Sequence, residues 1–196
     1  MKHTDRLRES LEKSILAKKE FLANYEQVDI FGRAIEAVVE GYRQGGRLYI
    51  AGNGGSAADA QHLAAEFVSK LAKPRAPLPA EALTVDSSIL TAIGNDYGYD
   101  EVFARQIAGK MRVNDLFLGI TTSGRSPNIL RALEQCRSMK MTTIVFCGRD
   151  GGDAKKLSDF CIIASGEETS TIQELHIVLA HTLCAAVEAE MFPDVV

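Results

Sequence analysis

The sequence has few of the features that mark membrane, secreted or nucleic-acid-binding proteins. No apolar run reaches the length of a membrane span, and the charged N-terminal segment is unlike a signal peptide. The net charge is −4, and no cluster of lysines and arginines offsets it locally, which argues against a nucleic-acid surface. We therefore expect a cytoplasmic protein with no nucleic-acid and no membrane partner.

The chain is also poor in recognisable cysteine and nucleotide-binding motifs. Its four cysteines form no C-x-x-C pair and fall in apolar segments, as reduced buried thiols do. There is no G-x-x-x-x-G-K-[ST] phosphate loop, and no G-x-G-x-x-G follows the first predicted strand, which excludes the common mononucleotide and dinucleotide sites. The cysteines are Cys136, Cys147, Cys161 and Cys184.

What is present is a regular alternation of strands and helices in a chain of one-domain length, 196 residues. Two amphipathic helices are predicted first, over 1–23 and 28–44. The alternation after them predicts an α/β fold with a doubly wound parallel sheet, whose ligands bind beyond the carboxyl ends of the strands. Predicted strands span 47–51, 82–85, 115–122, 142–147 and 160–164, and the later predicted helices span 87–95, 99–110, 127–139 and 171–191.

The first Gly/Ser-rich turn, residues 52–56, joins the first strand to an Ala-rich helix. Its three glycines let the backbone turn sharply and approach a ligand closely. Ser56 stands where the N-cap of the helix is expected, and the first turn of such a helix presents unpaired N–H groups and a positive dipole end. A phosphate group is the ligand that these features favour.

A polar stripe on the same helix contains two candidate ligands. His62 and Glu66 lie four residues apart, so their side chains can meet one metal ion or one substrate. A solvated helix face is the simpler explanation of an isolated His–Glu pair. The phosphate-type turn just upstream favours a functional site instead.

A second turn of the same kind occupies residues 121–126. Thr121, Thr122, Ser123 and Ser126 place four hydroxyl groups around one glycine, after a strand and before a helix. Pro127 suits the first turn of that helix, because its missing N–H costs nothing there. A plain Ser/Thr-capped helix is the alternative, but two such turns in one sheet favour a phosphate site, since hydroxyl and N–H groups can converge on one dianion.

Taken together and in this order, the motifs resemble the sugar isomerase (SIS) domain family, and most closely its phosphoheptose isomerases. The resemblance covers the whole chain and implies a five-stranded parallel sheet between helices. It also implies a single domain over 1–196 that assembles as a homotetramer, with the helices of residues 1–45 used for packing. The motifs are Gly52–Ala57, Asp59–His62, Glu66–Phe67, Leu90–Asp96, Thr122–Asn128 and Ile172–Glu174.

The activity that the resemblance implies is the isomerisation of a ketose phosphate to an aldose phosphate. Sedoheptulose 7-phosphate would become D-glycero-D-manno-heptose 7-phosphate through an enediol, as the first step toward nucleotide-activated heptose for lipopolysaccharide core or other surface glycans. Such a reaction needs a base of moderate pKa and an acid, and it benefits from stabilisation of the enediolate charge. A partly buried glutamate and a histidine suit it, and zinc would polarise the carbonyl.

The resemblance also implies which residues form the site. Ser56, Ser123 and Ser126, with Thr121 and Thr122 nearby, match the phosphate binders, and Asn53 and Asp96 match positions that hold sugar hydroxyls. Gly54, Gly55 and Gln173 complete the implied substrate-binding set. His62, Glu66, Gln173 and His181 match the ligands of one zinc ion per subunit, and Glu66 and His181 also match the acid/base pair. Two substrate-contact positions depart from the family pattern: Lys70 stands where many members have Arg, and Ser170 stands near where some have Asp.

Several alternatives stay open at the sequence level. A glutamate bound to zinc is a weaker base, so which of Glu66 and His181 is base and which is acid is undecided. Gln173 and His181 are eight residues apart, about 12 Å along a helix axis, so one ion would have to lie between them. Judged by its apolar neighbours alone, His181 is best interpreted as a hydrogen-bonded core histidine, and so is His176.

A second class of function competes with the enzyme. Non-catalytic SIS proteins use the same tetramer to bind a partner such as the replication initiator DnaA. They are similar across the glycine turn but do not keep both acid/base residues, whereas Glu66 and His181 are both present here. A sugar-phosphate-sensing regulator would normally include a DNA-binding segment, and no basic helix-turn-helix stands out. The sequence therefore favours the isomerase.

Overall fold

The computed structural model describes residues 3–195, so the first two residues of the helix predicted over 1–23 lie outside the described part. The strands are β1 (Leu48–Gly52), β2 (Ala80–Ala82), β3 (Leu116–Thr121), β4 (Thr142–Gly148) and β5 (Phe160–Ala164). The helices are α1 (His3–Ala23), α2 (Tyr25–Arg43), α3 (Gly55–Val68), α4 (Ser87–Asp96), the 3₁₀ turn η1 (Tyr99–Glu101), α5 (Ala104–Lys110), α6 (Pro127–Ser138), α7 (Ala154–Leu157) and α8 (Thr169–Met191).

The five strands form one parallel sheet in the order β2-β1-β3-β4-β5. The strands β1 and β3 are buried along their whole length and β4 at all but its first residue, which is why they are near-continuous apolar runs. The chain moves from β1 outward to β2 and then crosses to β3 on the other side of β1. The predicted doubly wound α/β fold is therefore confirmed, and the strand order reverses between β1 and β3, where such sheets bind ligands.

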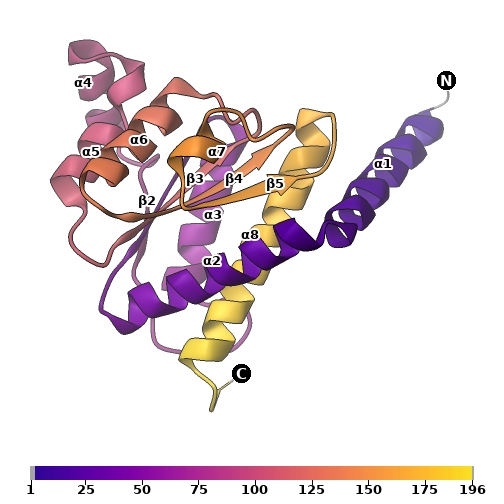
Figure 1. The fold of residues 1–196 in the computed structure, drawn as a ribbon, viewed down its shortest axis with the longest axis horizontal. Coiled ribbons are helices and arrows are strands. Elements are labelled where there is room, and N and C mark those ends of the chain that lie inside the picture. The colour runs from indigo at the N-terminus through magenta and orange to yellow at the C-terminus, as the bar shows by residue number, and fades with distance from the viewer. Residues whose placement is uncertain (1–2, 196) are drawn as a thin grey trace.

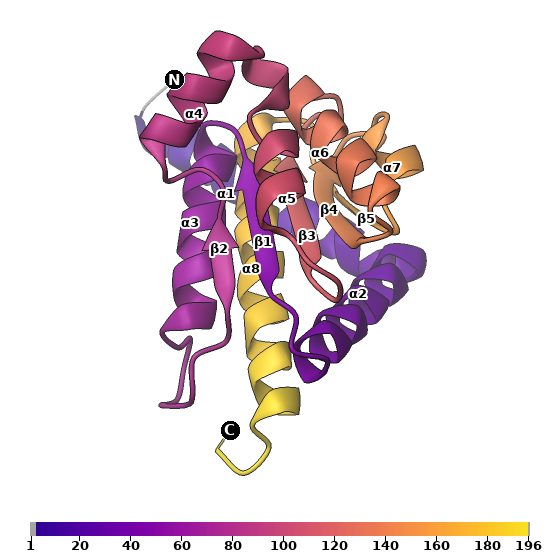
Figure 2. The same ribbon diagram turned by 90° about the vertical axis from the view of Figure 1, so that its left-hand side faces the viewer.

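Helices cover both faces of the sheet (Figures 1 and 2). On one face α2, α3 and α8 pack on a core that includes Phe67 and Phe146. On the other face α5, α6 and α7 pack on a second core that includes Phe117 and Ile129. Because α3 and α6 leave neighbouring strands toward opposite faces, the turns that begin them lie at the switch point of the sheet, where ligands are expected.

The N-terminal helix α1 stands out from the body, whereas α2 lies along the sheet (Figure 1). Lys13 ties α1 to α8 through an ion pair with Glu168 at 2.7 Å. One stripe of α1 leaves apolar side chains in solvent. Its residues, with their exposed fractions, are Leu7 at 62%, Leu11 at 54%, Ile15 at 53% and Leu22 at 68%.

The structure corrects two of the predicted elements and adds a third. The second strand ends at Ala82 and does not run over 82–85, because the chain turns after the Leu83 N–H reaches Ile50 O at 2.9 Å, toward the Asp86 cap of α4. The helix predicted over 99–110 is split into η1 and α5, and the two buried residues between them, 102 and 103, pack on the core. The short helix α7 was not predicted.

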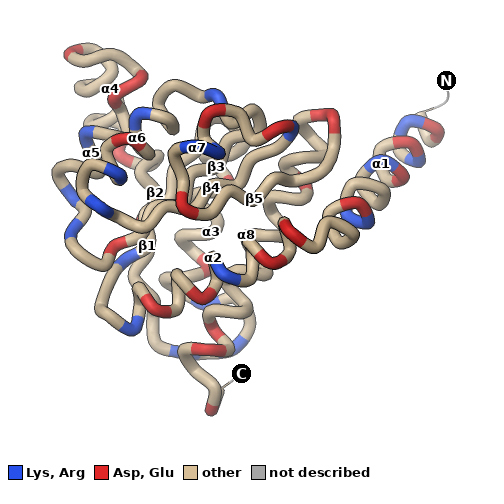
Figure 3. The backbone as a smooth tube through the Cα atoms, in the orientation of Figure 1, with Lys and Arg blue, Asp and Glu red and all other residues tan. Residues whose placement is uncertain are grey.

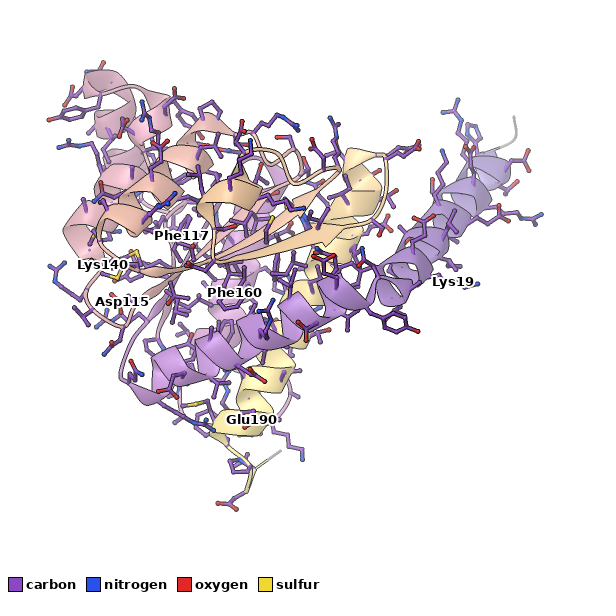
Figure 4. All side chains as sticks on the ribbon, in the orientation of Figure 1. Lys19, Asp115, Phe117, Lys140, Phe160 and Glu190 are labelled. Atoms are coloured by element: carbon purple, nitrogen blue, oxygen red, sulfur yellow. The ribbon has the colours of Figure 1, made fainter. Side chains whose placement is uncertain are left out.

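Local hydrogen bonds hold the loops at the amino ends of the strands in place. Asp115 and Lys140 lie at this end of the sheet, in the two loops that precede β3 and β4 (Figure 4). The carboxylate of Asp115 accepts hydrogen bonds from the backbone N–H groups of Arg47 and Arg112, at 2.8 and 2.7 Å. These bonds hold the loops that precede β1 and β3, so the carboxyl ends of these strands lie in fixed register.

The composition of the surface and interior agrees with the sequence analysis. Basic and acidic residues are interspersed along the chain (Figure 3). All four cysteines are buried free thiols, as predicted. None of the described helices combines the length and the apolar character needed to cross a membrane.

Candidate active site

The two Gly/Ser-rich turns meet at the carboxyl ends of β1 and β3, as predicted. A reciprocal amide pair joins them: Asn53 Nδ2 donates to Asn128 Oδ1 at 2.9 Å, and Asn128 Nδ2 donates to Asn53 Oδ1 at 2.8 Å. The hydroxyl of Tyr99, from η1, lies 3.4 Å from the same Asn53 oxygen. Asn128 is buried, so it holds the half-buried Asn53 amide in one orientation between the two turns.

The first turn is built differently from the sequence prediction. Gly54, not Ser56, is the N-cap of α3, and its φ of +57° is a backbone conformation that favours glycine. Ser56 is the second residue of the helix and is buried, with its N–H bonded to Asn53 O at 3.0 Å. Gly55 packs so closely on α8 that a Cβ there would lie 2.6 Å from Gln173 Nε2. The conformation at Gly54 therefore favours glycine, whereas a side chain at Gly55 would require the Gln173 side chain to move.

The second turn begins α6 at Ser126, with Pro127 in its first helical turn, as predicted. The hydroxyl groups of Thr121 and Ser126 lie 2.9 Å apart, and Ser123 Oγ accepts the Arg125 N–H at 3.1 Å. Thr121 is buried, while Thr122, Ser123 and Ser126 are half-buried. The turn thus brings the hydroxyl groups of Thr121 and Ser126 together, where a bound anion can compete for them.

A guanidinium group stands beside this turn. Arg125 donates to Ser123 O at 3.1 Å and forms a two-point ion pair with Asp150, at 2.9 and 2.5 Å. This hydrogen bonding with Arg125 lowers the pKa of Asp150 to about 2, so the pair stays charged at neutral pH. The pair braces the second turn against the loop after β4.

Helices α3 and α8 run side by side in the same direction (Figure 2). The contacts between the two helices follow in the same order along both of them. Gly55 lies against Gln173, His62 contacts His181, and the segment just after α3 bonds to Glu188. Both helices bury apolar stripes against the sheet, including Leu63 and Leu183. Parallel packing therefore brings two polar side-chain rows together that are more than a hundred residues apart in sequence.

His62, Glu66 and His181 form a cluster on these two helices. His62 Nε2 lies 3.1 Å from Glu66 Oε1 and 3.3 Å from His181 Nε2. One ligand atom from each residue falls within 4.8 Å of the others, a set that can hold a metal ion. The His62 side chain is 45% exposed and that of Glu66 22%, so the cluster is open to a substrate on one side.

The two histidines that the sequence could not distinguish have different environments. His176 is buried, and its Nε2 lies 3.0 Å from Cys147 O. Burial lowers the pKa of His176 to about 4, so this side chain is a neutral core histidine, in agreement with the sequence interpretation. His181 is half-buried, and its ring meets that of His62 edge to face at 5.0 Å. The interpretation of His181 as a core residue is wrong.

The remaining predicted residues lie around this centre rather than in it. Gln173 is half-buried beside Gly55, two turns of α8 before His181. Asp96 is exposed at the end of α4 and accepts a hydrogen bond from Asn95 at 2.8 Å. Every residue of α4 keeps at least partial exposure, so this helix is a projecting element. Lys70 and Ser170, the two departures from the family pattern, are both exposed.

Sequence reasoning gave no role to three residues that shape the site. Asn128 and Tyr99 reach Asn53 from two other elements, and Arg75 reaches the backbone of Glu66 from a proline-rich loop. Asn128 had a local signal, an amide side chain directly after the Ser-Pro step of a phosphate-type turn. Tyr99 and Arg75 had none, because both contacts depend on how distant segments fold together.

Comparison with known proteins agrees with this geometry. The SIS domain family matches residues 13–148. The chain is 45% identical to the phosphoheptose isomerase of Aneurinibacillus thermoaerophilus over 188 residues, which cover 96% of this chain and 95% of that protein. It is 44% identical to the phosphoheptose isomerase of Clostridium acetobutylicum over 184 residues, 94% of each chain. The structure of phosphoheptose isomerase GmhA from Neisseria gonorrhoeae superposes with a TM-score of 0.89 at 37% identity, covering 96% of this chain and 100% of that one. This chain therefore belongs to the phosphoheptose isomerase family of SIS-domain proteins.

Proposed function

We propose that the protein is an aldose–ketose isomerase that converts sedoheptulose 7-phosphate to D-glycero-D-manno-heptose 7-phosphate through an enediol. The observation that carries this proposal is the convergence of Glu66, on a helix that begins at a phosphate-type turn, with His181, in a chain of this family. The product would feed nucleotide-activated heptose for lipopolysaccharide core or other surface glycans. We assign the reaction to the cytoplasm, because four buried free thiols suit a reducing compartment.

The spacing along α3 suits a seven-carbon sugar phosphate. Ser56, Ser123 and Ser126, with Thr121 and Thr122, would hold the phosphate at the switch point between β1 and β3. His62 lies seven residues after Gly55, about 10 Å along the helix axis. That separation is comparable to the length of an extended heptose with its phosphate on the last carbon. The opposite end of the sugar, C1 and C2, would then lie beside Glu66 and His181, and Asn53, Gln173 and Asp96 would contact hydroxyl groups between.

The acid/base chemistry follows from the two side chains. Isomerisation moves one proton between C1 and C2 and another between their oxygens, so a base and an acid must face the same two carbons. A glutamate with 22% of its side chain exposed and a half-buried histidine meet this need while most water is kept away. His62 connects them and can hold either one in place through its Nε2.

The cluster also fits a zinc ion. Zinc binds histidine nitrogen at 2.0–2.1 Å in tetrahedral geometry, which separates two ligand atoms by about 3.3 Å. The distances from His62 Nε2 to His181 Nε2 and to Glu66 Oε1 are 3.3 and 3.1 Å. We propose that these three residues hold one zinc ion per subunit, with Gln173 as the predicted fourth ligand if its side chain turns from Gly55 toward His181. Bound zinc would polarise the substrate carbonyl.

We further propose that the chain acts as one domain and assembles as a homotetramer through its N-terminal helices. The exposed apolar stripe of α1, Leu7, Leu11, Ile15 and Leu22, offers the kind of surface that a monomer rarely leaves in water. Light scattering of the wild type at micromolar concentration should give a tetrameric mass. Leu11→Glu with Ile15→Glu should lower that mass, whereas a monomeric and fully active wild type would contradict the proposal.

Glu66→Gln should lower kcat for sedoheptulose 7-phosphate by about 10²–10⁴-fold, because it removes a proton-transfer group while keeping the side-chain shape. His181→Gln should have an effect of similar size. With the wild type in D₂O, deuterium should enter the product at C2, read by NMR. Glu190→Gln, which alters an exposed ion pair near the end of α8, is the matched control and should leave kcat unchanged.

Two results would contradict this mechanism. Wild-type turnover by Glu66→Gln would make Glu66 a ligand or a bystander. No turnover by the wild type would favour the alternative, a non-catalytic SIS protein that binds a partner such as DnaA.

Ser123→Ala and Ser126→Ala should each raise KM about 10-fold or more, since a hydrogen bond to a charged group is worth about 1.5–3 kcal/mol. Ser138→Ala removes a hydroxyl at the far end of α6, where it bonds only within its own helix, and serves as control. Initial rates over a range of substrate concentrations measure the effect. An unchanged KM in both variants would mean that the phosphate binds elsewhere.

Protein purified without chelator should contain roughly one zinc per chain by elemental analysis if the site is closed. His62→Ala removes the central ligand of the cluster and should abolish that stoichiometry, whereas His176→Gln should keep it, because His176 lies in the core. Absence of zinc, together with activity that resists chelators, would remove the metal and leave the acid/base proposal intact.

A further inference from the structure

Arg75 is a loop residue with a fully buried charged side chain. It comes from the proline-rich segment 73–79 that joins α3 to β2, where an arginine is normally exposed. Its side chain is 0% exposed, and its guanidinium group donates four hydrogen bonds. The acceptors are Glu188 Oε1 at 2.8 Å, Glu66 O at 2.9 Å, Phe67 O at 2.7 Å and Ala76 O at 3.0 Å.

Two of these acceptors belong to the last turn of α3. The carbonyl groups of Glu66 and Phe67 lie near the end of the helix, where the next residues no longer supply helical N–H donors. The fork of the guanidinium group spans both carbonyls and closes the turn from outside. The residue whose backbone it holds, Glu66, is the one whose side chain faces His62.

The third acceptor belongs to α8. Glu188 is 2% exposed, and its second carboxylate oxygen accepts the Leu71 N–H at 3.3 Å. The ring of Phe192 covers the guanidinium group at 5.6 Å. Glu188 follows His181 by seven residues, close to two helical turns, so both side chains leave the same face of α8. The Arg75–Glu188 ion pair therefore joins the last turn of α3 to α8. On α8 the joined position lies two helical turns after His181.

We infer that Arg75 and Glu188 are positioning residues for the acid/base pair. Neither touches the cluster's reacting atoms. Arg75 fixes the last turn of α3, Glu188 fixes the neighbouring stretch of α8, and the bond between them sets the distance and rotation that bring Glu66 and His181 together. This inference rests on the proposed isomerase function. It gives a reason for a buried ion pair, which by itself is weak support for stability.

Arg75→Lys tests the inference, because lysine keeps the buried positive charge beside Glu188 but lacks the planar fork that reaches two carbonyls. We expect a folded protein whose kcat falls about 10- to 100-fold, the effect of a displacement near 1 Å between reacting groups. KM should stay within about twofold, since the phosphate turns lie at the other end of α3. A double variant, Arg75→Met with Glu188→Met, should fold with the same loss of kcat, because no charge is left unpaired.

A second readout does not depend on turnover. The chain has four histidines, so labelled imidazole resonances can be assigned one by one. At one fixed pH and without metal, Arg75→Lys should shift the resonances of His62 and His181, whose rings stack edge to face, and leave those of His3 and His176 in place. If the wild type proves inactive on sedoheptulose 7-phosphate, the proposed function fails, and this measurement still decides whether the pair positions the cluster.

The matched control is an ion pair on the other side of the sheet. Lys110 and Glu81 join α5 to β2 at 2.6 Å and are partly exposed. Lys110→Met with Glu81→Met should leave kcat, KM and the imidazole resonances unchanged. The inference is overturned if Arg75→Lys keeps wild-type kcat and wild-type resonances while lowering the unfolding temperature, because the pair then only stabilises the fold.

Discussion

The site depends on the parallel packing of α3 against α8. Each helix buries an apolar stripe on the same face of the sheet, and the polar stripes beside them are forced to face each other. This single contact pairs Gly55 with Gln173 and His62 with His181. A rotation of either helix would separate Glu66 from His181, so the apolar core on one side and the polar cluster on the other are two consequences of one packing arrangement.

The sheet supplies the other half of the site. Strand order reverses between β1 and β3, so the turns after these two strands lie on either side of the switch point where such sheets bind ligands. The amide pair of Asn53 and Asn128 holds the two turns at a fixed distance across it. The turns proposed to bind phosphate thus lie at the carboxyl ends of two strands, whereas the proposed acid/base pair lies on α3 and α8.

The outer elements are less constrained than this centre. α4 keeps every residue at least partly exposed, and α1 leaves an apolar stripe in solvent. Both helices form with little burial of their side chains against the rest of the chain. The α1 stripe is the surface that the proposed tetramer would cover, whereas the amide pair and the α3–α8 cluster are formed within one chain.

The sequence by itself determined the alternation of strands and helices, the two Gly/Ser turns and the four-residue spacing of His62 and Glu66, because each is a local pattern of apolar period, turn chemistry or helical geometry. The resemblance of its motifs to a known family added His181, which apolar neighbours alone would have assigned to the core. Local patterns failed in two places: Gly54, at a positive φ, caps α3 in place of Ser56, and helix 99–110 breaks so that its middle packs on the core. Only the tertiary structure decided that His176 is buried while His181 meets His62, and that Arg75 reaches Glu66 and Glu188, because these contacts join segments whose separation in sequence carries no information about their distance in space.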